Sequence, residues 1–449
     1  MANVTETFVL DGSYRRHDRV VIGGSPLRLF RLSAGGRRVV EAIEQRRPPP
    51  AGHAKLTSRL VDAGAIHPTP TDSPFTATDV TVVVPAYGAL PGTNHDGGTT
   101  IVVDDGSEPP LAAMPGRQTL RLTRNRGPAA ARNAGLAEVT TPLVAFVDTD
   151  VDLDDHWLDA LLPHFSDPRV ALVAPRVRST DGPTVIAKYE TTRSPLDLGS
   201  EPAGIAAGSR VSYVPAAAVV ARTDVLRAIE GFDETMRSGE DVDLVWRLLE
   251  AGHRCRYEPA STVHHRPRAT FAAWARQRMS YGRSAAVLDR KHPGAVAPLR
   301  MSGWSAAVWA LVFARRPVTA VVLAAGTTVA LRRKLHDLPA QESLRLAGLG
   351  HLHAGRQVAA TITRAWWPLA LVVALVFRRS RSIVVAAATV PPLLDWLAGR
   401  TSLDPVRYVA LRVADDVAYG AGLWIGVIEH RQIGALTPKF TNWPGRGAG

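Results

Sequence analysis

The stretch LVAFVDTD, residues 143–150, decides the fold, because it couples a buried strand to two acids. Its five apolar residues, Leu143–Val147, predict a strand covered on both faces, as in a parallel sheet. Asp148 and Asp150 follow directly, two positions apart. Adjacent carboxylates repel each other unless a cation lies between them, so this spacing predicts a site for Mg²⁺ or Mn²⁺. An acidic loop that caps the next helix is the alternative, since further Asp residues follow.

Apolar runs on both sides of this stretch predict the other strands of the same sheet. They alternate with helical segments between residues 78 and 275, which indicates an α/β domain with parallel strands. The runs are Val80–Val84, Thr100–Val103, Thr119–Leu122 and Val170–Pro175.

Polar residues follow the first two of these strands. Residues 82–87 (VVVPAY) and 101–107 (IVVDDGS) both end in a turn. In open parallel sheets, ligands bind beyond the carboxyl ends of the strands, where a carboxylate accepts a hydrogen bond from a nucleotide base or ribose. A strand that ends in an Asp-Gly turn needs no ligand, and this alternative stays open.

The stretch NRGPAAARNAG, residues 125–135, predicts a helix that begins near Pro128. Its small residues would let this helix approach its neighbours closely. Arg132 and Asn133 would supply hydrogen-bond donors near a phosphate or a ribose. A purely structural Ala-rich helix explains the same letters equally well.

The stretch SGEDVDLVWR, residues 238–247, predicts a helix with Glu240 and Asp241 in its first turn. The helix dipole alone favours acids there. The functional interpretation is that one of them faces a pocket and acts as a base. Further along, His264 and His265 follow a strand and are candidate metal ligands, although paired histidines are more often surface residues.

Residues 1–72 predict a small module of short strands and two amphipathic helices. Val20–Ile22 and Leu27–Leu32 indicate strands, and Ser33 is the expected N-cap of the first helix. A turn-rich, proline-containing linker, residues 68–74, ends the module.

Residues 276–449 contain apolar runs separated by arginine clusters. Each run is shorter than the roughly 20 residues that cross a bilayer upright, so we expect helices that lie in the headgroup layer of an anionic membrane. A soluble helical domain is the alternative. The runs are Trp304–Phe313, Pro317–Leu331, Trp366–Phe377, Ile383–Leu397 and Val417–Ile428.

Bulk composition limits the partners and the compartment. The formal net charge is +12, which suits an anionic partner, although arginine used as an ordinary surface residue gives the same balance. Basic residues are not interleaved with aromatic ones, which argues against nucleic acid. A single cysteine and an N-terminal stretch without an apolar leader predict a location on the cytoplasmic face of the cell membrane.

Six stretches in this order resemble the inverting family-2 glycosyltransferases with a GT-A fold: VVVPAY, VVDDGS, NRGPAAARNAG, FVDTD, GEDVDLVWR and PASTVHH, within residues 80–265. The resemblance implies a UDP-sugar donor, with Tyr87 and Asp105 at the uracil. It implies a divalent metal at the diphosphate and Asp241 as the catalytic base. The nucleotide-sugar-binding residues that it implies are Pro85, Tyr87, Asp104, Asp105, Arg132, Asn133, Asp148 and Glu240, and the metal ligands are Asp148, Asp150 and His265.

Residues 27–44 (LRLFRLSAGGRRVVEAIE) and 56–68 (LTSRLVDAGAIHP) resemble PqqD-type peptide-recognition modules, which are of winged-helix form. Joined to a family-2 domain and a hydrophobic tail, this module resembles the glycosyltransferases of mycofactocin systems. That resemblance implies transfer of glucose from UDP-glucose to a peptide-derived redox cofactor, with extension into an oligosaccharide.

Two departures from the family pattern stand out. Only the 13 residues Gly88–Thr100 separate Tyr87 from the second strand, where a parallel crossover needs about 10 to 12 at minimum, so the family's first helix is expected to be missing. Residues 274–282 (WARQRMSYG) lack the Q-x-x-R-W signature of processive relatives, which leaves the number of added sugars open. Two other functions stay open: a rhamnosyl- or galactofuranosyl-type transferase acting on a lipid-linked glycan, and a non-catalytic, membrane-tethered peptide-binding protein.

Overall fold

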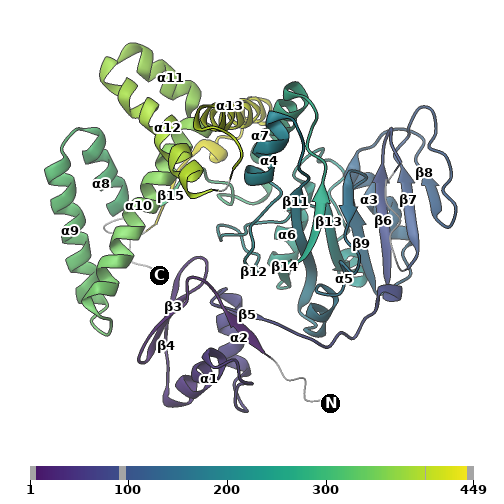
Figure 1. Cartoon of the computed structure of the whole chain (residues 1–449), viewed down its shortest axis with the longest axis horizontal. Coiled ribbons are helices and arrows are strands. Elements are labelled where there is room, and N and C mark those ends of the chain that lie inside the picture. Colours follow the sequence, from purple (N-terminus) through teal and green to yellow (C-terminus); the bar gives the residue numbers. More distant parts are fainter. Residues whose placement is uncertain (1–6, 91–97, 400, 442–449) are drawn as a thin grey trace. The chain divides into compact units, whose positions relative to one another are not determined.

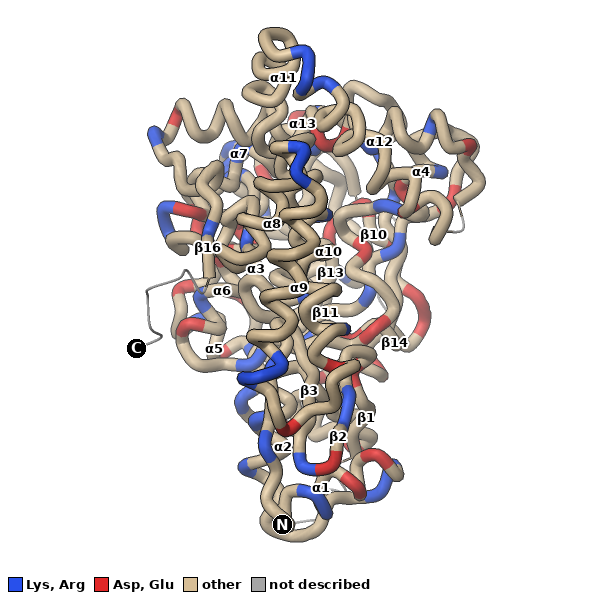
Figure 2. The backbone as a smooth tube through the Cα atoms, turned by 90° about the vertical axis from the view of Figure 1, so that its left-hand side faces the viewer, with Lys and Arg blue, Asp and Glu red and all other residues tan. Residues whose placement is uncertain are grey.

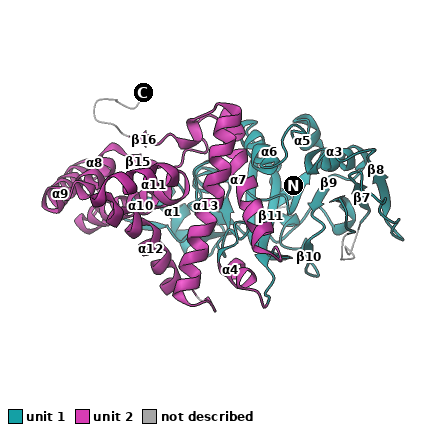
Figure 3. Ribbon diagram, turned by 90° about the horizontal axis from the view of Figure 1, so that it is seen from above, with its two compact units in different colours: residues 1–182, 193–267 teal, residues 183–192, 268–449 magenta. Residues whose placement is uncertain are grey.

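The computed structural model describes residues 7–90, 98–399 and 401–441 (Figure 1). The chain divides into two compact units, residues 1–182 with 193–267 and residues 183–192 with 268–449 (Figure 3). The residues of the predicted N-terminal module therefore share a unit with the central sheet. The sequence-based boundaries at residues 72 and 276 stay predictions.

The centre of unit 1 is a nine-stranded sheet in the order β10-β14-β11-β13-β9-β6-β7-β8, with β12 beside β14 (Figure 1). All five strands expected from apolar runs are present. They are β6 (Val80–Ala86), β7 (Thr100–Asp104), β8 (Gln118–Arg121), β9 (Leu143–Val147) and β11 (Val170–Ser179). The strands missed by the sequence patterns are β10 (Val151–Leu153), β12 (Ala203–Gly204) and β13 (Ala218–Arg222), and β14 (Arg254–His265) was expected only in outline.

The expected parallel strands are present, but the sheet is mixed. Strands β6, β7, β8 and β9 run parallel to their neighbours in that half of the sheet. Strand β13 lies antiparallel between β9 and β11, and β10 pairs antiparallel with the end of β14. The five residues of β13, AVVAR, are too few to distinguish a strand from a helix, so the reversal left no local signal.

Close packing of helix α3 (Pro128–Glu138) on β6 and β7 requires a glycine. A Cβ at Gly135 would lie 2.3 Å from Cγ1 of Val83, well inside van der Waals contact. The small residues in NRGPAAARNAG therefore do bring this helix close to the sheet, as expected. The helix that carries Glu240 and Asp241 is α6 (Glu240–Glu250), which follows the short α5 (Thr223–Ala228).

The N-terminal residues fold around a small core of their own. Ser33 caps α1 by accepting a hydrogen bond from the backbone N of Gly36, at 3.2 Å, as predicted. The elements are β1 (Phe8–Leu10) paired with β5 (Ile66–Pro68), the sheet β2 (Arg15–His17), β3 (Val20–Gly23) and β4 (Arg28–Arg31), and helices α1 (Ala34–Glu44) and α2 (Ala54–Asp62). The likeness of this arrangement to a PqqD-type module stays a prediction.

Unit 2 is mostly helical. Helix α7 packs along α13, and a Cβ at Gly282 would lie 1.9 Å from the carbonyl O of Tyr419, so the two backbones meet at glycine. The elements are α4 (Val185–Arg193), α7 (Phe271–Lys291), β15 (Arg300–Ser302), α8 (Gly303–Phe313), α9 (Pro317–Lys334), α10 (Ala340–Arg364), α11 (Trp367–Val376), α12 (Arg381–Ala398), α13 (Pro405–His430) and β16 (Lys439–Thr441).

In the described part of unit 2, one helical stretch, residues 378–398, is long and apolar enough to cross a membrane. It has 21 residues, because the arginines that flank the apolar run continue the helix, and only 6% of its apolar window is buried. Helices α10 and α11 would form a second such segment only as a pair bent by 85°. By length and composition alone, these features are weak evidence for spanning.

The short connection between β6 and β7 is described only in part. Residues 88–90 and 98–99 are not helical, whereas residues 91–97 lie outside the described residues. The missing first helix of the family therefore stays a prediction.

Candidate active site

Three motifs far apart in the sequence meet at the buried guanidinium of Arg132, on α3. Its Nη2 donates to Oδ1 of Asp148, just beyond β9, at 2.7 Å. Its Nη1 donates to Oε1 of Glu240, at the start of α6, at 2.8 Å. The ring of Phe232 lies beneath it, with the guanidinium carbon 5.3 Å from the ring centroid. The DTD loop and the Glu-Asp pair are therefore held together by one cation.

Asp241, the expected base, is half-buried beside this cluster. Its Oδ1 accepts from the backbone N of Val242 at 2.8 Å, and its Oδ2 accepts from that of Ala216 at 3.2 Å. Burial and the neighbouring Glu240 carboxylate raise the pKa of Asp241 to about 7, although Arg132 opposes the rise. A carboxyl group with this pKa exchanges protons readily near neutral pH.

The two predicted metal ligands Asp150 and His265 also come together. Nε2 of His265 lies 3.3 Å from Oδ2 of Asp150, because β14 ends where it pairs with β10. The neighbouring His264 turns away, with its Nδ1 3.1 Å from Oδ1 of Asp154. The choice of His265 rather than His264 as a metal ligand stays a prediction.

These side chains suit a hard divalent cation that is shared with a substrate. Within residues 7–90, 98–399 and 401–441, no group of three His, Cys, Asp or Glu side chains could hold a metal by itself. Mg²⁺ and its relatives are often held by one or two protein oxygens, with phosphate oxygens completing the shell. Asp148, the third predicted ligand, is engaged by Arg132. Burial and the carboxylates of Asp150 and Glu240 nevertheless raise its pKa, so a cation would relieve a real repulsion.

Asp104 and Asp105 build the loop after β7. Oδ1 of Asp104 accepts a hydrogen bond from the backbone N of Ser107 at 2.8 Å. Burial raises the pKa of Asp104, but its hydrogen bonds outweigh burial, so the pKa lies below the usual value. Both oxygens of Asp105 accept backbone N–H groups, from Arg126 at 2.7 Å and Gly127 at 2.8 Å. This corresponds to the turn-forming alternative noted for the Asp-Gly stretch. A nucleotide contact of these acids stays a prediction.

The other predicted nucleotide-binding residues differ in how freely they face solvent. Tyr87 is 62% exposed just after β6, and Pro85 is half-buried within that strand. Asn133 is engaged: its Nδ2 donates to the carbonyl O of Phe232 at 2.8 Å, and its Oδ1 accepts from the backbone N of the same residue. Asn133 therefore anchors the loop before α6 to α3, and its predicted ligand contact is untested.

Sequence reasoning missed Phe232, Ala216 and the loop that joins α5 to α6. These residues shape the surroundings of Arg132, Asn133 and Asp241 through contacts that span 25 to 101 residues of sequence. The stretch GFDETMR before the Glu-Asp pair carries no local pattern that indicates such a role.

Known proteins are similar to this chain over nearly its whole length. A pre-mycofactocin glycosyltransferase of Mycobacterium tuberculosis is 42% identical over 444 residues, which cover 94% of each chain, in strains CDC 1551 / Oshkosh and ATCC 25618 / H37Rv alike. The family model "Glycosyl transferase family 2" matches residues 96–222. The chain belongs to glycosyltransferase family 2. This family 2 chain is therefore a nucleotide-sugar glycosyltransferase, as its motifs predicted.

More distant relatives are less informative about this family 2 enzyme. The succinoglycan biosynthesis protein ExoO of Rhizobium meliloti is 30% identical over 210 residues, which cover 42% of this chain and 60% of that one. The solved structure of Staphylococcus aureus TarS 1–349 superimposes with a TM-score of 0.34 at 16% identity, covering 47% of this chain and 64% of that one. The mannosyltransferase PcManGT of Pyrobaculum calidifontis, solved with GDP-Man and Mn²⁺, gives 0.36 at 16% identity, covering 77% and 90%. The family assignment rests on the sequence relatives.

Proposed function

We propose that this family 2 enzyme transfers glucose from UDP-glucose, with inversion, to a precursor of a peptide-derived redox cofactor of the mycofactocin type. The acceptor class is supported by the 42% identity to the pre-mycofactocin glycosyltransferases. The observation that carries the chemistry is the meeting of the Asp148 loop and the Glu240–Asp241 pair at Arg132. It brings a base with a raised pKa next to the acids expected at the diphosphate.

Asp241 would remove the proton of the acceptor hydroxyl as that oxygen attacks the anomeric carbon. Such positioned base catalysis contributes roughly 10² to 10⁴-fold. Attack opposite the leaving UDP inverts the anomeric configuration. Asp150 and His265 would hold a divalent cation, Mg²⁺ or Mn²⁺, which offsets the charge that builds on the leaving diphosphate. Arg132 would keep the two acidic motifs together during the reaction.

A basic cleft in the N-terminal residues supports a peptide-derived acceptor or partner. Its volume is about 1080 Å³, and it lies between α1, α2 and the chain that joins them. Apolar side chains such as Leu32, Val39 and Leu56 line it, and none of its lining residues is acidic. This chemistry suits an extended segment with acidic and apolar side chains. The basic lining residues are Arg31, Arg38, Arg47, Lys55 and Arg59.

Exposed apolar helices support a location at the cytoplasmic face of an anionic membrane. Val318 on α9, Leu375 on α11 and Leu397 on α12 are 75%, 67% and 70% exposed. Figure 2 shows α9 without charged residues along most of its length, and basic residues follow at its end. Apolar faces next to arginine and lysine suit the interface between acyl chains and anionic headgroups. The same surface favours the lipid-linked glycan as a second candidate acceptor.

The test is turnover of radiolabelled nucleotide sugars by the full chain. UDP-glucose, GDP-mannose and dTDP-rhamnose are offered with Mn²⁺ or Mg²⁺ to a peptide-derived precursor and to a polyprenyl phosphate. We expect metal-dependent transfer from UDP-glucose to the peptide-derived acceptor, and none by Asp241→Asn. The number of glucose units on the product, read by mass spectrometry, shows whether the chain is extended. Transfer only to the polyprenyl acceptor would favour the second candidate, and absence of UDP release would favour a non-catalytic binding protein.

A further inference from the structure

A second cavity lies within unit 1, between the N-terminal residues and the edge of the central sheet. Its volume is about 200 Å³, well above the roughly 10–15 Å³ that a cavity needs, on the same measure, to hold one water molecule. None of the residues assigned above to the base, the metal or the nucleotide lines it. The charged and titratable lining residues are Asp11, Asp62, His67, Arg210, His253, Arg254, Cys255 and Arg256.

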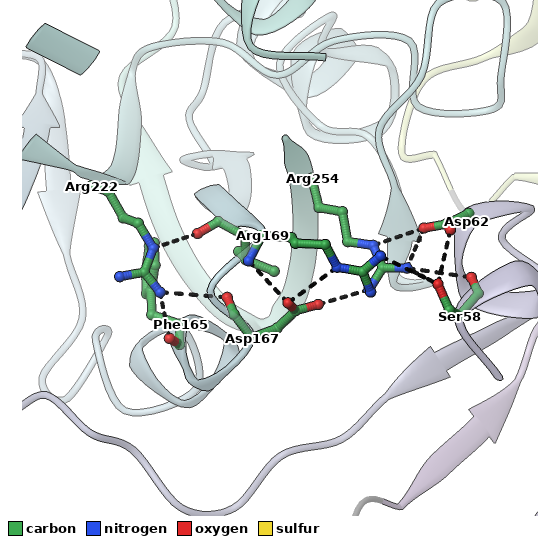
Figure 4. A network of polar contacts seen from close by, with 8 residues as sticks. Ser58, Asp62, Phe165, Asp167, Arg169, Arg222 and Arg254 are labelled. Atoms are coloured by element: carbon green, nitrogen blue, oxygen red, sulfur yellow. Dashed lines mark hydrogen bonds and ion pairs between the residues drawn. The ribbon is translucent and has the colours of Figure 1, made fainter. Parts of the chain in front are cut away.

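Both acids of this cavity are already paired. Oδ1 of Asp62 accepts from Nε of Arg254 at 2.7 Å, and Oδ2 of Asp11 lies 3.0 Å from Nε2 of His67. Figure 4 shows how completely Arg254 is satisfied, with Asp62 and Ser58 on one side and Asp167 on the other. The three arginines of the lining outnumber these two acids, so cations remain whose charge is not fully balanced.

Arg210 and Arg256 are those remaining cations. Among the residues that the structure describes, the Nη2 of Arg210 donates only to backbone carbonyls, of Pro202 at 2.7 Å and Glu201 at 3.2 Å. Arg256 is 2% exposed, and its Nε and Nη2 have no hydrogen-bond partner within the described part of the chain. Burial lowers the pKa of Arg256 to about 10 despite the attraction of Glu258, as expected of a charge without a close counter-ion.

The unpaired atoms of Arg256 match one kind of ligand. The N–H groups on Nε and Nη2 point from the same edge of the guanidinium plane, the edge that binds a carboxylate or a phosphate with two parallel hydrogen bonds. A buried donor without a partner in a native protein commonly marks a water or an ion. Both nitrogens are covered from solvent, so a ligand would reach them through a rotation of the side chain toward the cavity that it lines.

The surroundings extend this match to the N-terminal residues. Nδ1 of His67, on β5, is buried and also lacks a hydrogen-bond partner in the described structure. Burial, with a further contribution from Arg256 and Arg210, lowers the pKa of His67, so a bound anion would favour its protonated form. One anion could therefore neutralise charge on both sides of the cavity.

We propose that this cavity binds an oxyanion, a carboxylate or phosphate group, held by Arg256 of β14 and by groups of the N-terminal residues. The site goes beyond the proposed transferase activity and is distinct from it. Arg256 lies nine positions before His265 on the same strand, which places the two sites near opposite ends of β14. The bound anion strengthens the attachment of the N-terminal residues to the sheet, because it removes the cost of an unpaired buried charge.

The experiment measures binding of inorganic phosphate, and separately of succinate, to the full chain by isothermal titration and thermal shift. Potassium chloride at matched ionic strength is the reference, and UDP with Mn²⁺ is present throughout to fill a nucleotide site. We expect saturable binding of the anion and a rise in Tm of the natural chain. Arg256→Met should lower the affinity for the anion about tenfold or more. The control Arg169→Met removes a charge that touches Ser58 near the cavity but does not line it, and should bind as the natural protein does.

Two further observations keep the outcome decisive. Without added anion, Arg256→Met should be at least as stable as the natural chain, since it removes an unpaired buried charge. Arg256→Lys keeps the charge but loses the two-pronged edge, and should bind phosphate less tightly. A stronger response to phosphate than to succinate would identify a phosphate group as the ligand, and the reverse a carboxylate. Equal responses of the natural chain to phosphate, succinate and chloride, or equal binding by Arg256→Met, would overturn the proposal, whereas a failure of glucose transfer would not affect it.

Discussion

At the scale of single residues, Asp241 is the side chain on which the chemistry depends. Its pKa of about 7 determines how the rate depends on pH. The base works in its ionised form, so kcat/KM should rise with pH through this value and level off above it. An ordinary, exposed Asp would show no such dependence above pH 5, because its carboxyl group titrates at roughly 3.9. Asp241→Asn should lower kcat by about 10² to 10⁴-fold. Rate profiles from pH 5.5 to 9, with UDP binding measured beside them, check both points.

Arg132 should affect the same pH–rate profile through its charge. Its positive charge lowers the pKa of Asp241, so Arg132→Met should move the pH profile to higher pH as well as reduce the rate. A role limited to packing would reduce the rate without moving the profile. Arg132→Lys keeps the charge but cannot bridge Asp148 and Glu240 together, and should retain the natural profile at lower kcat. An unchanged profile in Arg132→Met would contradict this role.

The pair Asp150–His265 leads to a prediction about metal. His265→Ala removes one of two neighbouring predicted metal ligands, so the concentration of Mn²⁺ needed for half-maximal activity should rise about tenfold or more. His264→Ala is the matched control, since His264 pairs with Asp154 instead and should leave the metal requirement unchanged. Titration of Mn²⁺ against initial rate, with UDP-glucose held constant, separates the two. Equal effects of both variants would contradict the assignment of His265.

Individual acids were easier to find in the sequence than their partners. Asp148 and Asp150 were singled out because they follow a buried strand, and the pair Glu240–Asp241 because it begins an amphipathic helix. The choice of Asp241 as the base came from the family resemblance. The bridge from Arg132 to Glu240 joins residues 108 positions apart, and no local rule predicts such a contact. For Asp104 and Asp105, the sequence left open whether the side chains form a turn or bind a nucleotide. Their hydrogen bonds to backbone N–H groups show the turn.

At the scale of elements, continuous apolar runs gave β6 and β9 correctly, because short runs of this kind are typical of strands buried on both faces. Strand β13 was missed, and with it the reversed direction in the middle of the sheet. The long helix α10 was also missed, because its apolar residues are sparse and several polar ones, such as Ser343 and Thr361, are buried. Strand pairing and tertiary packing determine β13 and α10, and a short stretch of sequence does not specify either.

The contact of α3 with β6 gives a prediction at this scale. Gly135→Ala would place a Cβ 2.3 Å from Cγ1 of Val83, so α3 must shift or the strand must yield. Overpacking of this kind costs about 1–3 kcal/mol. Urea unfolding of the full chain should show the loss of stability in the transition of unit 1. Gly348→Ala on α10 is the control: no atom lies within 4 Å of its Cβ, and alanine favours the helix by up to about 1 kcal/mol.

At the scale of the whole molecule, one chain carries a transferase site, a basic cleft and an exposed apolar surface. Each of these features suits a different partner. An activated sugar suits the acids, an acidic peptide segment suits the cleft, and a membrane suits the exposed helices. The sequence indicated all three classes of partner through motif, resemblance and composition. It could not show which helical faces stay uncovered, because exposure depends on how α9 to α12 pack.

That exposure makes membrane binding testable with the full chain. Sedimentation with vesicles should show binding to phosphatidylglycerol-containing bilayers and little to pure phosphatidylcholine, and the difference should shrink with salt because basic residues supply part of the attraction. Leu375→Gln and Arg379→Glu, both at exposed positions of unit 2, should each weaken binding several-fold. Arg19→Glu changes an equally exposed charge in unit 1 and should not. If all three variants sediment alike, the apolar helices do not face a bilayer, and a soluble helical domain with an unidentified protein partner becomes the better account of unit 2.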